Sequence, residues 1–262
     1  MAEPVRAVDR ALDILLCFTR EQPSLSLTQI AELVRMSKTT VHRLLATLET
    51  KRFVTKDKGT GLYRLGFRLI EMASLVLQDV EIQRWARPYL QSLSNLVGET
   101  VDLAILDGSQ VVYLDVIESP QRIKLAAAVG QRLPAFCTAS GKAMLAYMPE
   151  ETVRKILGEN MRKYTDHTDV SIPDILEDLR VTAGRGYAAS EEQYERDINA
   201  VAAPIFDAER HPIAAIAIAG PSFRMPKERF PELGELIRKE TQLVTNEVGE
   251  VALGIILAKS RP

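Results

Sequence analysis

The chain has 262 residues, of which 46% are hydrophobic and 26% charged, with a formal net charge of −2. This composition is ordinary for a globular protein, and the length allows two domains. We expect no membrane span, because no apolar run approaches the ~18 residues needed, and no signal peptide, because charges interrupt the first 16 positions.

Cysteine and histidine usage narrows the class further. Two cysteines cannot form a disulfide framework in a chain of this size, and three scattered histidines offer no metal-ligand spacing. We therefore expect a cytoplasmic protein without a metal or cofactor.

Charge is divided unevenly along the chain. Residues 1–70 hold 12 Lys and Arg against 7 Asp and Glu, a balance of +5, and the remainder has a balance of −7. Such asymmetry is expected when one domain meets phosphates and the other does not. Alone it does not identify the partner, because surface composition varies freely.

The first helix is predicted before Pro23 from the spacing of its apolar residues. These are Val8, Leu12, Leu15 and Phe18. A second helix begins at Ser26, where Gln29 three residues later completes the pattern of a capping box. After a short turn, Ser37 caps a third helix. Its apolar side carries Val41, Leu44, Leu45 and Leu48.

The opposite face of the third helix is polar and basic. With the capping Ser37 it presents Lys38, Thr39, Thr40, His42 and Arg43. These residue types reach base edges and phosphates, and two short helices around a tight turn place such a helix in the major groove of DNA. The alternative is a helical hairpin whose polar face is simply solvated.

A basic hairpin follows directly. Residues 53–55 and 62–65 are predicted strands, joined by a polar turn that contains two glycines. A hairpin in this position is a wing, whose Lys56, Lys58 and Arg64 we expect along the phosphates. The sequence therefore predicts a winged helix-turn-helix domain over residues 5–66.

Three stretches resemble the IclR-type transcriptional regulators. They are RAVDRALDIL at 6–15, LSLTQIAELVRMSKTTVHRLLATLETKRFV at 25–54 and YRLGFRLIEMA at 63–73. The resemblance extends over nearly the whole chain. It implies a homo-oligomer, a dimer or dimer of dimers, whose winged domains bind a pseudo-palindromic operator in double-stranded DNA.

The junction is predicted to be a connector helix over residues 67–80, because the segment lacks Pro and Gly and repeats apolar residues with helical spacing. Pro88 disfavours helical geometry at Arg87, so we expect the chain to break or bend there. Another helix is predicted from Tyr89 to Gly98.

The larger domain, residues 81–262, is predicted to be α+β with a mostly antiparallel sheet. The expected strands are two hairpins, 101–107 with 111–118 and 198–207 with 213–220, and a third possible strand at 124–129. The expected helices lie at 141–159, 173–184 and 226–257. The resemblance implies that this domain is a GAF-like effector-binding domain.

Catalytic signatures are weak. Ser140-Gly141-Lys142 lacks the preceding Gly of a phosphate-binding loop, and Cys137 has no nearby His in the sequence. The acidic group Glu191, Glu192 and Glu195 is typical of a solvated face. The sequence therefore predicts no catalytic residues and a protein that is not an enzyme.

The resemblance places an effector cavity at residues 134–147 and at three segments that face them. The expected lining residues are Phe136, Ala139, Ser140, Gly141, Ser190, Ala200, Ala217 and Ala219. Amides at a helix start can hold a ligand carboxylate, and Lys142 either assists an anion or faces solvent. The alternative is a tight loop-to-helix turn packed with small residues.

Ala200, Ala217 and Ala219 bear on the chemical class of the effector. Family members that bind small hydroxy- or keto-acids tend to carry an acid, Cys or Ser at these positions. Alanine would leave the polar groups of such a ligand desolvated and unpaired, and it leaves more space. We therefore expect a larger, partly apolar organic acid, such as an intermediate of aromatic degradation.

These features together predict a ligand-responsive regulator that controls a catabolic operon. Because members of the family are commonly repressors, we expect a repressor. The connector helix would pass the effect of the ligand to the DNA-binding domains. Two alternatives are a metabolic enzyme with a DNA-binding appendage and an adaptor whose helical hairpin docks another protein.

Overall fold

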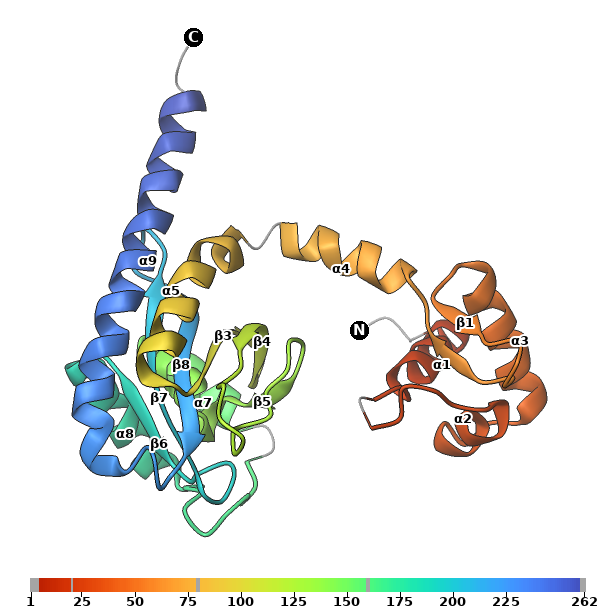
Figure 1. Ribbon diagram of the computed structural model, residues 1–262, viewed down its shortest axis with the longest axis horizontal. Coiled ribbons are helices and arrows are strands. Elements are labelled where there is room, and N and C mark those ends of the chain that lie inside the picture. The colour runs from red at the N-terminus through yellow and green to blue at the C-terminus, as the bar shows by residue number, and fades with distance from the viewer. Residues whose placement is uncertain (1–4, 20, 79–80, 159–160, 260–262) are drawn as a thin grey trace. The chain divides into compact units, whose positions relative to one another are not determined.

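The computed structural model describes residues 5–19, 21–78, 81–158 and 161–259 (Figure 1). The chain divides into two compact units, Met1–Val80 and Glu81–Pro262. Within the described residues, no helix combines the length and the hydropathy that crossing a bilayer requires.

The first unit contains four helices and a hairpin in its described part. They are α1 (Arg6–Leu16), α2 (Leu27–Leu33), α3 (Lys38–Thr50), β1 (Val54–Lys56), β2 (Tyr63–Leu65) and α4 (Arg68–Gln78). The hairpin is antiparallel, with Thr55 opposite Arg64, and Leu25 exchanges two main-chain hydrogen bonds with Tyr63. Its core gathers Ile14, Leu25, Ile30, Ala31, Val41, Leu45, Val54 and Tyr63.

Both predicted helix caps are confirmed. The amide of Ser26 donates to Oε1 of Gln29 at 2.9 Å, and the amide of Gln29 donates to Oγ of Ser26 at 3.3 Å, which completes the capping box. Oγ of Ser37 accepts from the amide of Thr40 at 3.3 Å. These caps fix both helix starts and therefore the turn between α2 and α3.

The apolar face predicted for the first helix is only partly buried. Ile14 is fully buried, whereas Val8 and Leu12 are 57% and 53% exposed. α1 ends at Leu16, well before Pro23. The helix is apolar on two sides, and α3 packs against only one of them.

Of the break or bend predicted at Pro88, the break is wrong. α5 runs without interruption from Glu81 to Val97 with Pro88 inside it. Pro88 has no amide proton, so the helix lacks one main-chain hydrogen bond there. The side chains of Ala86, Leu90 and Leu93 on the inner face of α5 are buried and hold the helix against the sheet. The connector helix predicted over 67–80 is α4 in its described part, and residues 79 and 80 lie outside the described residues.

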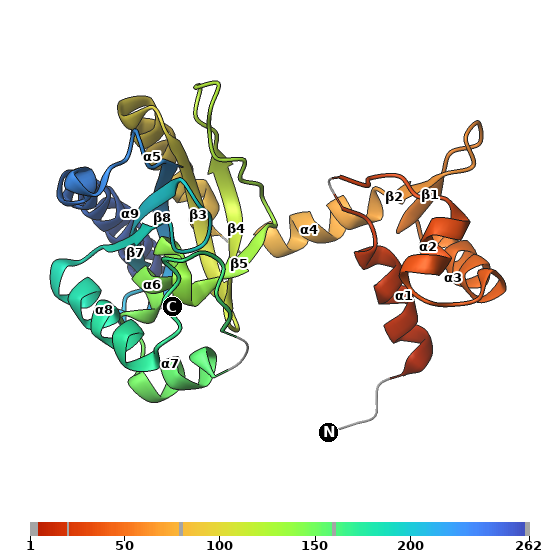
Figure 2. The same ribbon diagram turned by 90° about the horizontal axis from the view of Figure 1, so that it is seen from below.

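The second unit is built on a six-stranded sheet with every pairing antiparallel, as predicted (Figure 2). The spatial order is β5-β4-β3-β8-β7-β6. The strands are β3 (Thr100–Asp107), β4 (Gln110–Ile117), β5 (Arg132–Pro134), β6 (Ala188–Glu191), β7 (Ile198–Phe206) and β8 (Pro212–Pro221).

Helices cover both faces of this sheet. α5 packs against β3 and β4, and the closing helix α9 (Phe230–Lys259) packs against β7 and β8. The other face is covered by α6 (Ala139–Leu145), with α8 (Ile172–Arg185) packed on α6 and β6 and α7 (Glu150–Leu157) on α8. Short 3-10 turns precede α6 at Ala135–Cys137 and α9 at Lys227–Arg229. Both faces of the central strands are therefore buried.

Three predicted elements differ from the structure. Residues 124–129 form no strand, because Gly130 and Gln131 take both main-chain hydrogen bonds of Tyr113 at the edge of β4, and β5 follows instead. The helix predicted at 141–159 is two helices, because α6 ends at Leu145 and α7 begins after Pro149, and residue 159 lies outside the described residues. The short strand β6 was not predicted.

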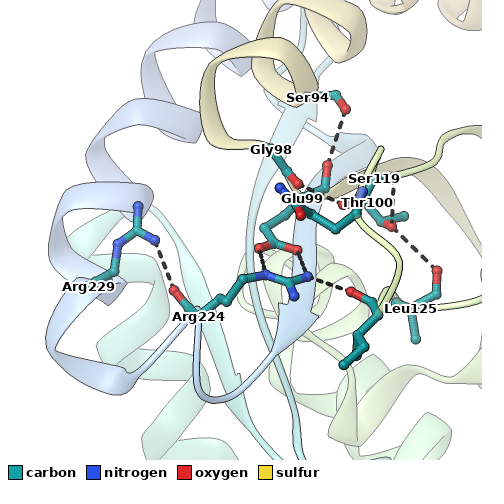
Figure 3. A network of polar contacts seen from close by, with 10 residues as sticks. Ser94, Gly98, Glu99, Thr100, Ser119, Leu125, Arg224 and Arg229 are labelled. Carbon is teal, nitrogen blue, oxygen red and sulfur yellow. Dashed lines mark hydrogen bonds and ion pairs between the residues drawn. The ribbon is translucent and has the colours of Figure 1, made fainter.

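A polar network fixes the first residues of β3 (Figure 3). Nη2 of Arg224 donates to Oε2 of Glu99 at 2.8 Å, and its Nε donates to Oε1. The hydroxyl of Thr100 accepts from the amide of Ser119 at 3.2 Å and donates to the carbonyl of Leu125 at 3.4 Å. The network therefore ties the long loop after β4 to the start of β3 and to the segment after β8.

We expect Arg224→Ala to lower the free energy of unfolding by about 3 kcal/mol, because Glu99 is only 5% exposed and would be left as a buried, unpaired charge. Chemical denaturation of the second unit measures this. The control is Arg154→Ala, which removes an exposed pair with Glu150 and should change stability by less than about 1 kcal/mol. Equal effects of the two variants would contradict the prediction.

Candidate functional site

The polar face of α3 is open to solvent. Ser37, Lys38, Thr39, His42 and Arg43 are exposed, and Thr40 is half-buried because its hydroxyl lies 2.9 Å from Oγ of Ser37. On the opposite side of the helix, Val41 and Leu45 are fully buried. Because one side of α3 is buried, only its polar side faces solvent. The exposed side chains are hydrogen-bond donors that suit phosphates and guanine.

The hairpin adds three exposed basic residues. Lys56 lies on β1 with Nζ 5.3 Å from the centre of the Tyr63 ring, Lys58 lies in the turn, and Nε of Arg64 donates to Ser24 at 2.7 Å. Asp57 shapes the turn, since Oδ1 accepts from Gly59 and Thr60, and these hydrogen bonds lower its pKa.

Two further basic residues, which the sequence analysis did not single out, flank α3. Arg35 and Arg52 are exposed and have left-handed backbone, with φ of 51° and 62°. They occupy the turns immediately before and after α3. No sequence signal distinguished them from other surface arginines. Non-glycine residues rarely adopt the left-handed backbone conformation, and here the turns around α3 impose it.

The second unit contains a cavity between α6 and the sheet, with about 560 Å³ of empty space including its open mouth. Six of the eight predicted effector residues line it, namely Ala139, Ser140, Ser190, Ala200, Ala217 and Ala219. The remaining lining residues are Asp102, Tyr113, Leu125, Gln131, Leu133, Thr138, Tyr194, Glu195 and Ile198. None of the lining residues is Lys or Arg.

Strand register explains why the cavity lies here. Thr100, Ala219, Ala200 and Ser190 stand side by side across four neighbouring strands, and the next row places Asp102 beside Ala217. Because these side chains are small, a space remains between the sheet and α6, and this space is the cavity. Ser190 is committed to the fold, since its hydroxyl donates to the carbonyl of Cys137 at 3.1 Å.

Phe136 and Gly141 are not among the residues that line this cavity. The Phe136 ring instead packs toward Tyr164, with ring centroids 6.3 Å apart, and borders two other hollows. Gly141 faces the preceding turn, where a Cβ atom would lie 2.1 Å from the carbonyl oxygen of Ala135. Gly141 therefore allows close helix packing rather than approach of a ligand.

Lys142 neither assists an anion in this cavity nor faces solvent. Its side chain is 2% exposed, and Nζ donates to Asp178 and Gln193 at 2.7 Å each and to the carbonyl of Ala189. Burial lowers the pKa of Lys142, and Asp178 opposes that shift. All three of its donors are used, so Lys142 ties α6 to α8 and β6.

The sequence analysis missed Asp102, the one carboxyl buried in the cavity wall. Its side chain is 1% exposed, Oδ1 accepts from the hydroxyl of Ser140 at 3.4 Å, and Oδ2 has no hydrogen-bond partner. Burial raises its pKa to about 8, and the hydrogen bond from Ser140 opposes the shift only weakly. The available signal was an acid near the start of a strand, directly between the apolar residues Val101 and Leu103.

Tyr113 borders the same space. Its side chain is 6% exposed, and burial raises its pKa well above 10, with Asp102, Tyr194 and Glu195 adding to the shift. The ring is therefore a neutral wall of the cavity that carries one hydroxyl group.

Neither Cys137 as a nucleophile nor the Asp207, Glu209 and His211 group as a metal site is supported by its surroundings. Burial raises the pKa of Cys137 to about 12, which removes the thiolate that a nucleophile needs. Asp207, Glu209 and His211 bring ligand atoms within 4.8 Å of one another. However, Oδ1 of Asp207 accepts from the amides of the other two, which is the ordinary organisation of a hairpin turn.

A winged helix-turn-helix unit followed by an α/β unit with a cavity beside its sheet is typical of ligand-responsive transcriptional regulators. The family model for the bacterial transcriptional regulator IclR C-terminal domain matches residues 74–246, and that for the IclR helix-turn-helix domain matches residues 7–58. The chain therefore belongs to the IclR family. It is a DNA-binding transcriptional regulator and not an enzyme.

Relatives cover almost the whole chain. It is 33% identical to the transcriptional repressor IclR of Escherichia coli and 32% identical to the acetate operon repressor of Salmonella typhimurium, in each case over 94% of this chain and 90% of the relative. The crystal structure of Thermotoga maritima IclR matches with a TM-score of 0.77 and 30% identity, covering 92% of this chain and 98% of that one.

The pKa of Asp102 gives a stability prediction. The folded chain holds a proton on Asp102 up to about pH 8, whereas an unfolded Asp releases it near pH 4. The stability that this proton contributes is therefore complete below about pH 4 and is lost as the pH rises toward 8.

Asp102→Asn lacks this dependence. Between pH 5 and pH 8, we expect the wild type to lose at least about 1.4 kcal/mol of unfolding free energy relative to the variant, the equivalent of one pKa unit. Denaturant titrations of both proteins at the two pH values measure the difference. Parallel pH curves would show that Asp102 is ionised in the folded chain.

Proposed function

We propose that the chain is a repressor of a catabolic operon and that an organic acid, bound in the cavity between α6 and the sheet, modulates its binding to DNA. The observation that carries this is the cavity beside α6, which lies in a unit separate from the exposed basic face of α3. Both relatives named above are repressors, which favours repression over activation.

The walls of the cavity favour an effector with an apolar body. Ala200, Ala217 and Ala219 form one side, and the Tyr113 and Tyr194 rings border the space. A small, highly polar acid would find few free partners there. A solved IclR homologue from Microbacterium hydrocarbonoxydans, 21% identical with a TM-score of 0.82, contains 4-hydroxybenzoate. An aromatic acid of this kind is the effector class that we propose.

The proposed DNA contacts are the exposed polar face of α3 and the hairpin. They are Ser37, Lys38, Thr39, Thr40, His42, Arg43, Lys56, Lys58 and Arg64. Residues near the start of α3 would read base edges, and the hairpin lysines would neutralise phosphates. Arg64 is held by Ser24 and would act as a fixed charge.

The proposed operator complex is a dimer. One side of α1 carries a continuous exposed apolar stripe of Val5, Val8, Leu12 and Leu16, from 53% to 78% exposed. A second copy of this chain is the occupant that fits the stripe, because two-fold pairing of winged units matches the pseudo-palindromic operator implied by the family.

Arg43→Ala tests the recognition face. We expect it to weaken operator binding by about 1–3 kcal/mol if Arg43 makes a bidentate base contact, and Lys58→Ala to reduce the salt slope by about 1 without changing sequence preference. Gel-shift titrations over a series of salt concentrations with the gene's own upstream region measure both. The control, Arg180→Ala, removes an exposed arginine of the second unit. Unchanged binding by Arg43→Ala would remove that residue from the recognition set.

The combined substitution Val8→Lys and Leu12→Lys tests the dimer. We expect about 100-fold weaker binding to a full operator, because paired winged units lose their avidity, and little change on a single half-site. Footprinting of the wild type should show half-sites about 34 Å apart or a multiple of that. Phe223→Ser, an exposed apolar residue of the second unit, is the control. A wild-type footprint over one asymmetric half-site would contradict the proposal.

A further inference from the structure

We propose that Asp102 is a ligand-binding residue which, as a neutral carboxylic acid, donates a hydrogen bond from Oδ2 to a carboxylate or carbonyl oxygen of the effector, and that it limits the effector to at most one negative charge. The inference rests on the proposed function, since it concerns the same cavity. It names the chemical group that would recognise the effector and the class of acids that would be rejected.

The position of Asp102 is fixed by the sheet. It lies on the central strand β3, opposite Val116 on β4 and Ala217 on β8. Neither neighbour offers a hydrogen-bonding side chain. Oδ1 meets Ser140 on α6, whereas Oδ2 is fully buried without a partner.

An unpaired buried oxygen is unfavourable, because it has lost water without gaining a protein partner. Most buried polar side chains are paired, and the other buried charges near this site follow that rule. Lys142 uses all three donors, and Glu99 is paired through both oxygens. Asp102 therefore differs from residues that only maintain the fold, and it lines the one cavity beside it.

The surroundings of Asp102 favour its neutral form. The titratable groups that border the same space are Tyr113 on β4 and Tyr194 and Glu195 on the segment before β7, and α6 contributes only the neutral Ser140. No Lys or Arg lines the cavity to stabilise a carboxylate. The pKa of Asp102, about 8, agrees with a proton retained at neutral pH.

A neutral Asp102 has one O–H to give. Because Oδ1 already accepts from Ser140, the proton on Oδ2 is the one directed at a ligand. A ligand carboxylate is the strongest acceptor for such a donor. A second ligand charge would be stabilised by no cation of the lining and would be repelled by Glu195, so a dicarboxylate of the same size would bind poorly.

Calorimetric titration of the full chain with benzoate tests this. Benzoate is ionised throughout the range, so above about pH 8 its binding must return a proton to Asp102. We expect affinity about tenfold lower at pH 9 than at pH 7, with roughly one proton taken up at pH 9, measured in two buffers of different ionisation enthalpy. Terephthalate should bind at least about tenfold more weakly than benzoate at pH 7.

Variants separate the role of Asp102 from that of the cavity. Asp102→Asn keeps a donor and should bind benzoate with the same affinity at pH 7 and pH 9, whereas Asp102→Leu should lose at least about tenfold at pH 7. Asp107→Asn is the matched control, because it makes the same substitution on the same strand at an exposed carboxylate outside the cavity lining, and it should retain the pH dependence of the wild type. Near-UV circular dichroism and operator binding without benzoate report whether each variant is folded.

Three outcomes would overturn the inference. One is an Asp102→Asn protein that keeps the tenfold pH effect, and another is equal affinity for terephthalate and benzoate. The third is tighter binding of benzylamine than of benzoate, which would mean that Asp102 acts as an ionised acceptor. If benzoate, phenylacetate and 4-hydroxybenzoate all fail to bind the wild type, the proposed aromatic-acid effector is wrong, and this inference falls with it.

Discussion

The close approach of α6 to one face of the six-stranded sheet determines where the second unit is packed and where it is hollow. At one side of the helix Gly141 lies against the turn at Ala135, so tightly that no side chain fits. Lys142 then binds α6 to Asp178 on α8 and to the carbonyl of Ala189 on β6. With the helix held on that side, the small residues of the sheet leave the cavity open on the other.

The buried charged and titratable side chains of the second unit are of two kinds, those with complete hydrogen-bond partners and those without. Lys142 and Glu99 are charges whose partners are complete, and removal of a partner would leave an uncompensated charge in a dry environment. Asp102 is half-paired, and burial keeps it neutral near pH 7. Desolvation penalises both kinds: the partners of Lys142 and Glu99 offset that penalty, whereas Asp102 avoids it by keeping its proton, which is the basis of the recognition role that we propose for it.

The two units use opposite surfaces for their chemistry. In the first unit the basic and polar side chains of α3 are exposed, and the charge balance of residues 1–70 is positive. In the second unit Asp102, Ser140 and Ser190 in the cavity wall are buried, and none of the lining residues is basic. Long-range attraction to phosphates requires exposed charge, whereas discrimination among small molecules requires desolvation, so one chain needs two separate environments.

Local pattern alone was sufficient for the DNA-binding unit and for much of the sheet. The caps at Ser26 and Ser37 and the hairpins depend on neighbours a few residues away, which a sequence displays directly, whereas the pairing of β3 with β8 joins residues more than 100 positions apart. The uninterrupted α5, the irregular segment at 124–129 and the short β6 depended on packing and on strand edges. In the cavity, family resemblance supplied the alanines, but it placed Gly141 in the wall and missed Asp102. Which way a side chain points, and whether a buried carboxyl finds a partner, is decided by contacts between residues far apart in the chain, and only the tertiary structure provides them.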